Sequence, residues 1–87
     1  MTYAVRKITQ WDDTYWKYNN EADAIEAFLK AVHNASRIFC DYIALHTPDS
    51  TEPVAFWCAK TNTIESNEDY QHIAESYDHT KTYQHHR

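Results

Sequence analysis

The side chains best suited to hold a metal ion lie in one stretch near the C-terminal end of the sequence. Four of them recur at spacings of three or four residues: Glu68, His72, Glu75 and His79. On an α-helix this spacing places all four on one side, and imidazole and carboxylate groups can ligate zinc and other divalent ions. A structural zinc site usually has four ligands that include thiolates, but no cysteine lies nearby in the sequence. We therefore expect a solvated helix face without a bound metal, and metal binding through His72, Glu75 and His79 stands as an alternative.

The two cysteines, Cys40 and Cys58, fall in consecutive predicted strands, so a disulfide between them is geometrically feasible. Neither cysteine directly follows or precedes a basic residue that would activate it as a nucleophile. We expect buried, reduced thiols, because a cytoplasmic chain seldom keeps a disulfide.

The chain of 87 residues contains no glycine. Phosphate-binding loops, dinucleotide-binding turns and the turn that presents a nucleophilic serine all need glycine, because a Cβ atom blocks the backbone approach or the positive φ that they require. These functions are therefore excluded. A catalytic centre also needs a concave pocket, for which so short a chain has little volume. We expect no enzymatic activity and no cofactor, and we expect Asn or Asp wherever the backbone needs a positive φ.

Acidic residues dominate the charge of the chain, which is −5 at neutral pH. The acidic candidates for partner binding fall in two stretches: Glu21, Asp23 and Glu26, then Glu65, Glu68, Glu75 and Asp78. The candidate aromatic anchors are Trp11, Tyr15 and Trp16. These features predict a non-catalytic interaction module that docks on a protein with a basic surface, such as a nucleic-acid-binding protein. The carboxylates would steer the encounter, and the aromatic rings would anchor the complex.

Other partners compete with this hypothesis. On an open sheet face, aromatic rings beside Arg6 or Lys7 would stack on single-stranded bases, and the candidate rings are some of Tyr3, Trp11, Tyr15, Trp16, Tyr42 and Trp57. The negative net charge makes direct nucleic-acid binding the weaker hypothesis. An exposed sheet edge would also allow pairing with a second copy of the chain, which would give a homo-oligomer. Small size, acidity and many aromatic residues are typical of accessory proteins of phages and mobile elements, including inhibitors of host nucleases. No motif supports that likeness.

Patterns of apolar residues predict the secondary structure. Residues 3–11 are typical of a strand, and 15–18 of a second short strand or an extended approach to a helix. A helix begins after Asn20, which Asp23 can reach in a capping box, and Asn34 is a plausible left-handed stop. Its apolar face holds Ile25, Phe28, Leu29 and Val32.

Further along the chain, residues 37–47 and 54–60 predict a hairpin of two strands around a proline-containing loop, and apolar residues on both faces of 37–47 indicate a central strand. A second helix is expected from Ser66, capped with Asp69 and frayed after Tyr77. Its apolar face holds Tyr70, Ile73, Ala74 and Tyr77.

Together these elements predict an α+β fold in the order β-(β)-α-β-β-α, with a small antiparallel sheet of three or four strands and two helices on one face. We expect one compact domain over 1–80 and a polar, frayed tail over 81–87, whose His85 and His86 would bind metals only nonspecifically. The sequence has no apolar run of about 18 residues and no apolar N-terminal block. We therefore expect a cytoplasmic protein that does not bind membranes.

Overall fold

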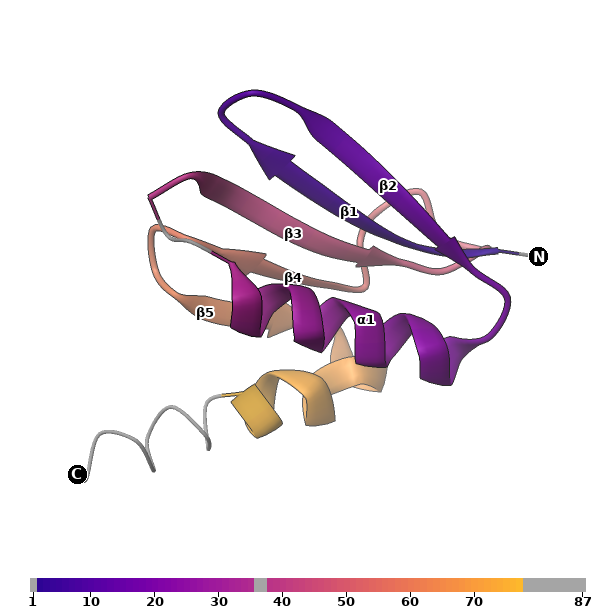
Figure 1. Cartoon of the computed structure of the whole chain (residues 1–87). Helices are drawn as coiled ribbons and strands as arrows, with labels where there is room; N and C mark the ends of the chain where they lie inside the picture. Colours follow the sequence, from indigo (N-terminus) through magenta and orange to yellow (C-terminus); the bar gives the residue numbers. More distant parts are fainter. Residues whose placement is uncertain (1, 36–37, 78–87) are drawn as a thin grey trace.

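The computed structural model describes residues 2–35 and 38–77. Within these ranges it is an α+β fold whose antiparallel sheet carries helical segments on one face (Figure 1). The elements in chain order are β1 Tyr3–Thr9, β2 Asp13–Tyr18, α1 Glu21–Asn34, β3 Cys40–His46, β4 Ala55–Cys58, β5 Thr63–Ser66, the 3-10 turn η1 Glu68–Tyr70, and helical residues 71–77. The predicted tail over 81–87 lies outside the described residues.

The described strands are ordered β2-β1-β3-β4-β5, and each pairs antiparallel with its neighbours. The central position of β3 confirms the prediction, since Ile43 and Leu45 are buried on one face while Ala44 is buried on the other. On the helix side of the sheet, Val5 lies opposite Leu45 and Trp57 lies opposite Ile43 on the neighbouring strands. The pairing therefore aligns large apolar side chains beneath the helices.

Helix α1 begins as the sequence predicts. The Asn20 side chain accepts a hydrogen bond from the Asp23 backbone N–H at 2.8 Å, and the Asn20 amide donates to the Asp23 carboxylate at 3.0 Å. Phe28 and Val32 are buried, as are the sheet residues that they face. The predicted left-handed stop at Asn34 is wrong, because Asn34 does not have a positive φ and the residue that follows α1, Ala35, is extended with φ −72° and ψ 139°.

The C-terminal part contains a strand that the sequence did not predict. Residues Thr63–Ser66 form β5 against β4, which makes five strands in the described sheet instead of three or four. Ile64 lies opposite Trp57 and is buried, so this pairing adds to the core. The predicted cap at Ser66 is wrong, because Ser66 ends β5 and Asn67 precedes η1.

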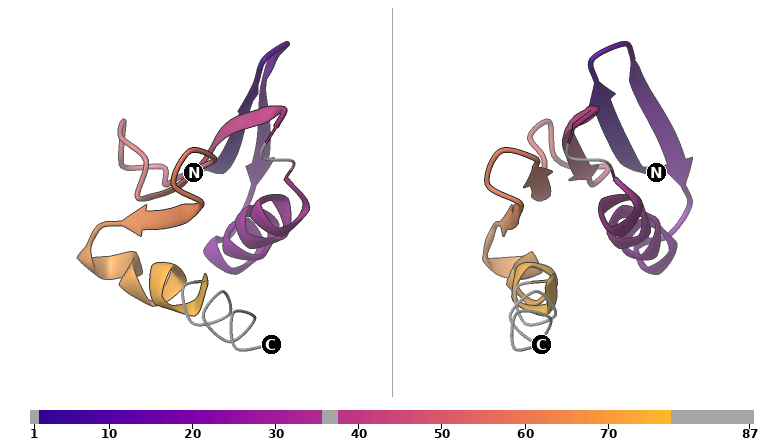
Figure 2. Two further views of the ribbon diagram at one scale, coloured as in Figure 1. Left: turned by 90° about the vertical axis from the view of Figure 1, so that its left-hand side faces the viewer. Right: turned by 60° about the vertical axis from the view of Figure 1, so that its left-hand side comes forward.

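Both helical segments cover the same face of the sheet (Figure 2). The second segment buries Ile73 and half-buries its predicted companions on the apolar face, Tyr70, Ala74 and Tyr77. This confirms the predicted placement of two helices on one face. None of the helices in the described part of the chain has the length and apolar character needed to cross a membrane.

Candidate functional site

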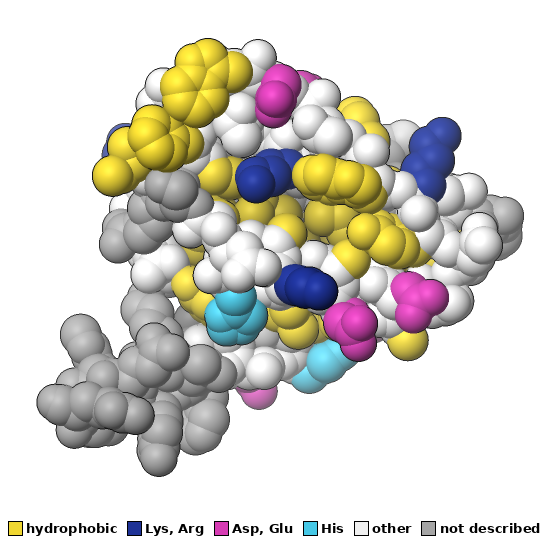
Figure 3. Space-filling model, viewed as in Figure 1, with side chains coloured by type: hydrophobic (Ala, Val, Ile, Leu, Met, Phe, Trp, Pro, Cys, Tyr) yellow, Lys and Arg dark blue, Asp and Glu magenta, His cyan; other side chains and the backbone are white. Residues whose placement is uncertain are grey.

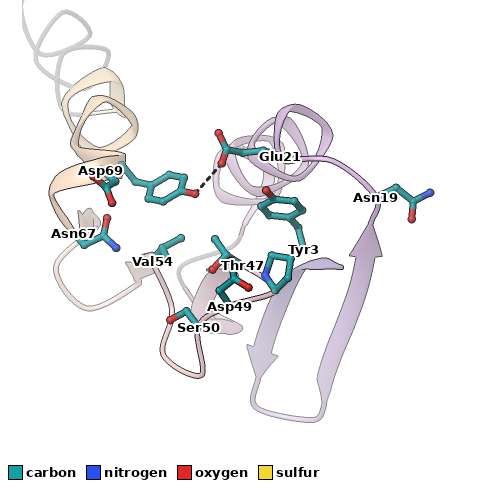
Figure 4. Close-up of a pocket in the computed structure, with 11 residues that line it drawn as sticks. Tyr3, Asn19, Glu21, Thr47, Asp49, Ser50, Val54, Asn67 and Asp69 are labelled. Atoms are coloured by element: carbon teal, nitrogen blue, oxygen red, sulfur yellow. Dashed lines mark hydrogen bonds between the residues drawn. The ribbon is translucent and has the colours of Figure 1, made fainter. Parts of the chain in front are cut away.

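A pocket of about 650 Å³ lies at the end of the sheet where β2 leads into α1 (Figure 4). We call it the acidic pocket. Its wall combines Glu21 at the start of α1, Asp49 in the β3–β4 loop, Asp69 and Tyr70 in η1, and Tyr3 at the start of β1. The pocket thus forms only when four separate parts of the chain come together.

Backbone hydrogen bonds fix the connections that form this pocket. The Val54 N–H donates to the Leu45 carbonyl at 2.8 Å, which holds the end of the β3–β4 loop against the sheet. The Asn67 N–H donates to the Val54 carbonyl at 3.0 Å, and the Tyr70 N–H donates to the Asn67 carbonyl at 3.2 Å. The loop and η1 are therefore attached to each other and to the central strand.

The chemistry of the acidic pocket suits a cation. Glu21, Asp49 and Asp69 are all exposed, and none of the described residues that line the pocket is Lys, Arg or His. The partial positive charge of the α1 N-terminus is met by Glu21 in the first turn. The buried side chain of Val54 adds an apolar part to the wall.

Tyr70 connects η1 to α1 inside the pocket. Its hydroxyl donates a hydrogen bond to Oε2 of Glu21 at 2.8 Å, shown as the dashed line in Figure 4. Burial, followed by this hydrogen bond and the nearby negative charge, raises the pKa of Tyr70 to about 12. The tyrosine therefore stays protonated at neutral pH and orients the Glu21 carboxylate.

The structure places the predicted acidic residues in several different surroundings. Glu21 lines the acidic pocket, whereas Asp23 is occupied in capping α1. Glu65 and Glu68 line a neighbouring hollow of about 390 Å³ beside β5. The exposed residues Glu26 and Glu75 line neither cavity, and Asp78 lies outside the described residues.

The sequence reasoning missed two carboxylates of the acidic pocket. Asp49 lies in the loop between Pro48 and Pro53, which was interpreted only as a connection. Asp69 was assigned to a helix cap, but no side-chain hydrogen bond caps η1 in the structure. Because Asp49 follows the predicted central strand, its position at an end of the sheet could have been inferred from the sequence. Which other residues lie beside it there could not.

The predicted anchor Trp11 lies at the opposite end of the sheet, in the turn between β1 and β2. Its ring contacts Phe39 at a centroid distance of 5.3 Å, and Trp11, Phe39 and Ile38 are 71%, 47% and 73% exposed. We call these three residues the hairpin-end patch, and Figure 3 shows hydrophobic side chains gathered at that end of the molecule. Gln10 ties the patch together, since its backbone N–H and its side-chain amide donate to the carbonyls of Phe39 and Ile38.

Tyr15 and Trp16, the other predicted anchors, point to opposite faces of the edge strand β2. Tyr15 lies opposite Arg6 on the open face, with the Arg6 guanidinium 5.3 Å from the ring centroid. Trp16 lies opposite Val5 on the helix side and lines an apolar groove of about 230 Å³ between β2 and α1. Trp11, Tyr15 and Trp16 therefore do not form one surface.

Of the aromatic residues expected for base stacking, Tyr15 and Tyr42 lie on the open face of the sheet with Arg6, but this arginine is engaged. Arg6 bonds the Asp13 carboxylate through two nitrogens, at 2.9 Å and 2.5 Å. This hydrogen bonding lowers the pKa of the Asp13 carboxyl and raises that of Arg6. Tyr42 and Phe56 stack nearby at 5.4 Å, while Trp57, which was considered for this face, is buried on the other.

The described residues do not form a group of ligands that would support the metal-binding alternative. Within 2–35 and 38–77, no three His, Cys, Asp or Glu side chains are grouped so that they could hold a metal ion. His72 and Glu75 are exposed, and His79 lies outside the described ranges. Both cysteines are free thiols, and burial raises the pKa of Cys40.

Comparisons with models of known protein families, with curated proteins and with solved structures find no match to this chain. The geometry and charge of the sites described above are therefore the basis for the function proposed below.

Proposed function

We propose that the chain is a non-catalytic interaction module that docks on a basic surface of a partner protein through its acidic pocket. The observation that supports this is the convergence of Glu21, Asp49 and Asp69 on one concavity whose described lining has no basic side chain. Complementary charge would steer such a partner to the pocket and fix its orientation.

Because the pocket carboxylates are exposed to solvent, each contributes little to the affinity of such docking. Each carboxylate is exposed, so a single ion pair with the partner contributes about 0.5–1 kcal/mol, which corresponds to about two- to fivefold in affinity. The proposal therefore needs several carboxylates to act together, as the pocket arranges them. The hairpin-end patch would add apolar contact area for partners that reach across the sheet.

The partner class follows from the charge. Proteins that bind nucleic acid present Lys and Arg to the phosphates, so their binding surfaces are basic. A module that occupies such a surface competes with the nucleic acid and acts as an inhibitor. Accessory proteins of phages and mobile elements are one class that would use this activity.

The experiment measures fluorescence anisotropy of a labelled basic peptide, composed of Arg, Lys and Ser, with the full chain at low and at high salt. We expect binding that weakens with salt. The double variant Glu21→Gln, Asp69→Asn should weaken it about fourfold to twenty-five-fold, because two pocket carboxylates are lost.

The matched control is Glu26→Gln with Glu75→Gln, which changes the net charge equally at exposed positions that do not line the pocket. This control should retain most of the affinity. Equal losses in the two double variants would show that only overall charge matters, and absence of binding at low salt would refute the proposal.

A further inference from the structure

We infer that the chain forms a symmetric dimer in which the edge strand β2 pairs antiparallel with β2 of a second copy. Among the described strands β2 has a neighbour on one side only, β1, and its other side can take a further strand (Figure 1). The residues that support the dimer are Asp13, Tyr15 and Lys17, and none of them lines the acidic pocket. The dimer therefore goes beyond the proposed function, and each can be wrong without the other.

The backbone of the β1–β2 hairpin determines which residues can bond a further strand. In the turn, the Thr9 N–H donates to the Asp12 carbonyl at 2.9 Å, so the backbone of Asp12 faces β1. Successive strand residues direct their N–H and carbonyl groups to alternate edges. Every second residue after Asp12 therefore directs these groups away from β1, and these residues are Asp13, Tyr15 and Lys17.

The charges of β2 select one register for the pairing. When Tyr15 lies opposite its own copy, Asp13 of each chain lies opposite Lys17 of the other, and all of these residues are on the open face. The three outward-facing residues of one strand then meet those of the second strand. Opposite charges across an antiparallel pair stabilise it, whereas like charges destabilise it. The edge of β2 is thus complementary in charge to itself.

The existing ion pair between Arg6 and Asp13 is compatible with this register. Arg6 donates two hydrogen bonds to the Asp13 carboxylate, which holds that carboxylate in place on the open face. A carboxylate has about four acceptor sites, so Asp13 can also accept from Lys17 of the second copy. The lysine would then contact a carboxylate that is already oriented.

The same register brings exposed aromatic rings together on both faces of the sheet. Tyr15 and Trp16 are 52% and 43% exposed in the single chain. In the dimer, the two Tyr15 rings lie directly opposite each other, and the two Trp16 rings lie diagonally across the symmetry axis on the helix side. Burial of these rings adds apolar contact area to the backbone hydrogen bonds and the ion pairs.

The opposite edge strand, β5, lacks this complementarity. Its four residues include one charged side chain, Glu65, so no register of β5 with its own copy pairs opposite charges. Its large apolar residue, Ile64, is buried in the core and offers no exposed surface to a second copy. Charge and exposed rings thus both favour β2 as the edge that pairs.

The test measures the mass of the full chain by sedimentation over a range of concentrations. We expect the mass to rise from that of one chain towards that of two, because a single strand pair is a small interface that dissociates on dilution. Amide hydrogen exchange, followed by NMR, locates the interface. The N–H groups of Asp13, Tyr15 and Lys17 should exchange at least about tenfold more slowly in the dimer than in the monomer.

Two substitutions test the pairing itself. Lys17→Glu replaces both ion pairs by like-charge pairs and should weaken dimerisation at least about tenfold. Lys60→Glu is the matched control, since it makes the same change of charge at an exposed position in the β4–β5 turn. Tyr15→Pro removes an outward-facing N–H, which an edge strand tolerates, and should abolish the dimer.

The outcomes are distinct. A dimer that is weakened by Lys17→Glu, retained in Lys60→Glu and protected at the three β2 amides would support the inference. A chain that stays monomeric at the highest concentration used for NMR would overturn it. Equal weakening by the two lysine substitutions, or slow exchange at amides other than those of β2, would also overturn it. If Tyr15→Pro does not fold, the two lysine variants still decide.

Discussion

Asn62 performs the role that glycine would otherwise take in this chain. It is the non-glycine residue with positive φ among the described residues, at 55°, and it lies in the turn between β4 and β5. Its side-chain oxygen accepts hydrogen bonds from the indole N–H of Trp57 at 3.1 Å and from the hydroxyl of Tyr77 at 2.6 Å. Asn62 therefore provides the positive φ of the turn, the hydrogen-bond acceptor for the buried indole and a hydrogen bond to the second helical segment.

Substitution of Asn62 separates these roles. Asn62→Gly keeps the backbone conformation but leaves the indole of the buried Trp57 without its acceptor, which should cost about 1–3 kcal/mol of unfolding free energy. Asn62→Ala should cost about 1 kcal/mol more, since alanine also resists positive φ. Asn62→Asp retains the hydrogen-bond acceptor and should lose the least unfolding free energy.

Urea denaturation measures this order of stabilities. An Asn62→Gly variant as stable as the native chain would show that the side-chain hydrogen bonds contribute nothing. The absence of glycine predicted that Asn or Asp would take positive φ, and this is confirmed, but the position was expected at Asn34. The turn at Asn62 could not be located because β5, which follows it, was not recognised.

At the scale of elements, prediction succeeded where the apolar periodicity was strong. Helix α1 and the central strand β3 each bury several residues along a continuous pattern. In β5 the buried residue is Ile64, and the other three residues are polar, so its strand character comes from pairing with β4. Such tertiary pairing leaves almost no signal in a four-residue segment.

The contact between α1 and η1 depends on the proton of Tyr70. The folded pKa of about 12 lies above the ordinary value of 10, so the folded state favours the protonated hydroxyl. Its contribution is therefore fully present below about pH 10 and is lost as the pH rises through about 12. Tyr70→Phe should lower the unfolding free energy at neutral pH by about 0.5–1.5 kcal/mol, because the hydrogen bond to Glu21 is removed.

Chemical denaturation of the native chain and of Tyr70→Phe at a series of pH values tests this dependence. The difference in unfolding free energy should be constant up to about pH 10 and then shrink. A difference that stays constant through pH 12, or a variant as stable as the native chain, would show that the hydroxyl does not stabilise this contact.

At the scale of the whole molecule, the sheet separates features that the sequence analysis had combined. Strands β1 and β3 run in opposite directions, so the β1–β2 turn lies at one end and the β3–β4 loop at the other (Figure 1). The hairpin-end patch and the acidic pocket are thus at opposite ends. Composition correctly indicated an acidic exterior with spare aromatic rings, but only the strand order shows which of these groups meet.

The central claim is that cationic groups bind in the acidic pocket and do not spread over the negatively charged surface. An NMR shift map of the full chain, titrated with the basic peptide, tests this most directly. We expect the largest saturable changes at Glu21, Asp49 and Asp69, with little change at Tyr15, Tyr42 or the hairpin-end patch. Changes of equal size all around the acidic surface, or centred on the open sheet face, would contradict it.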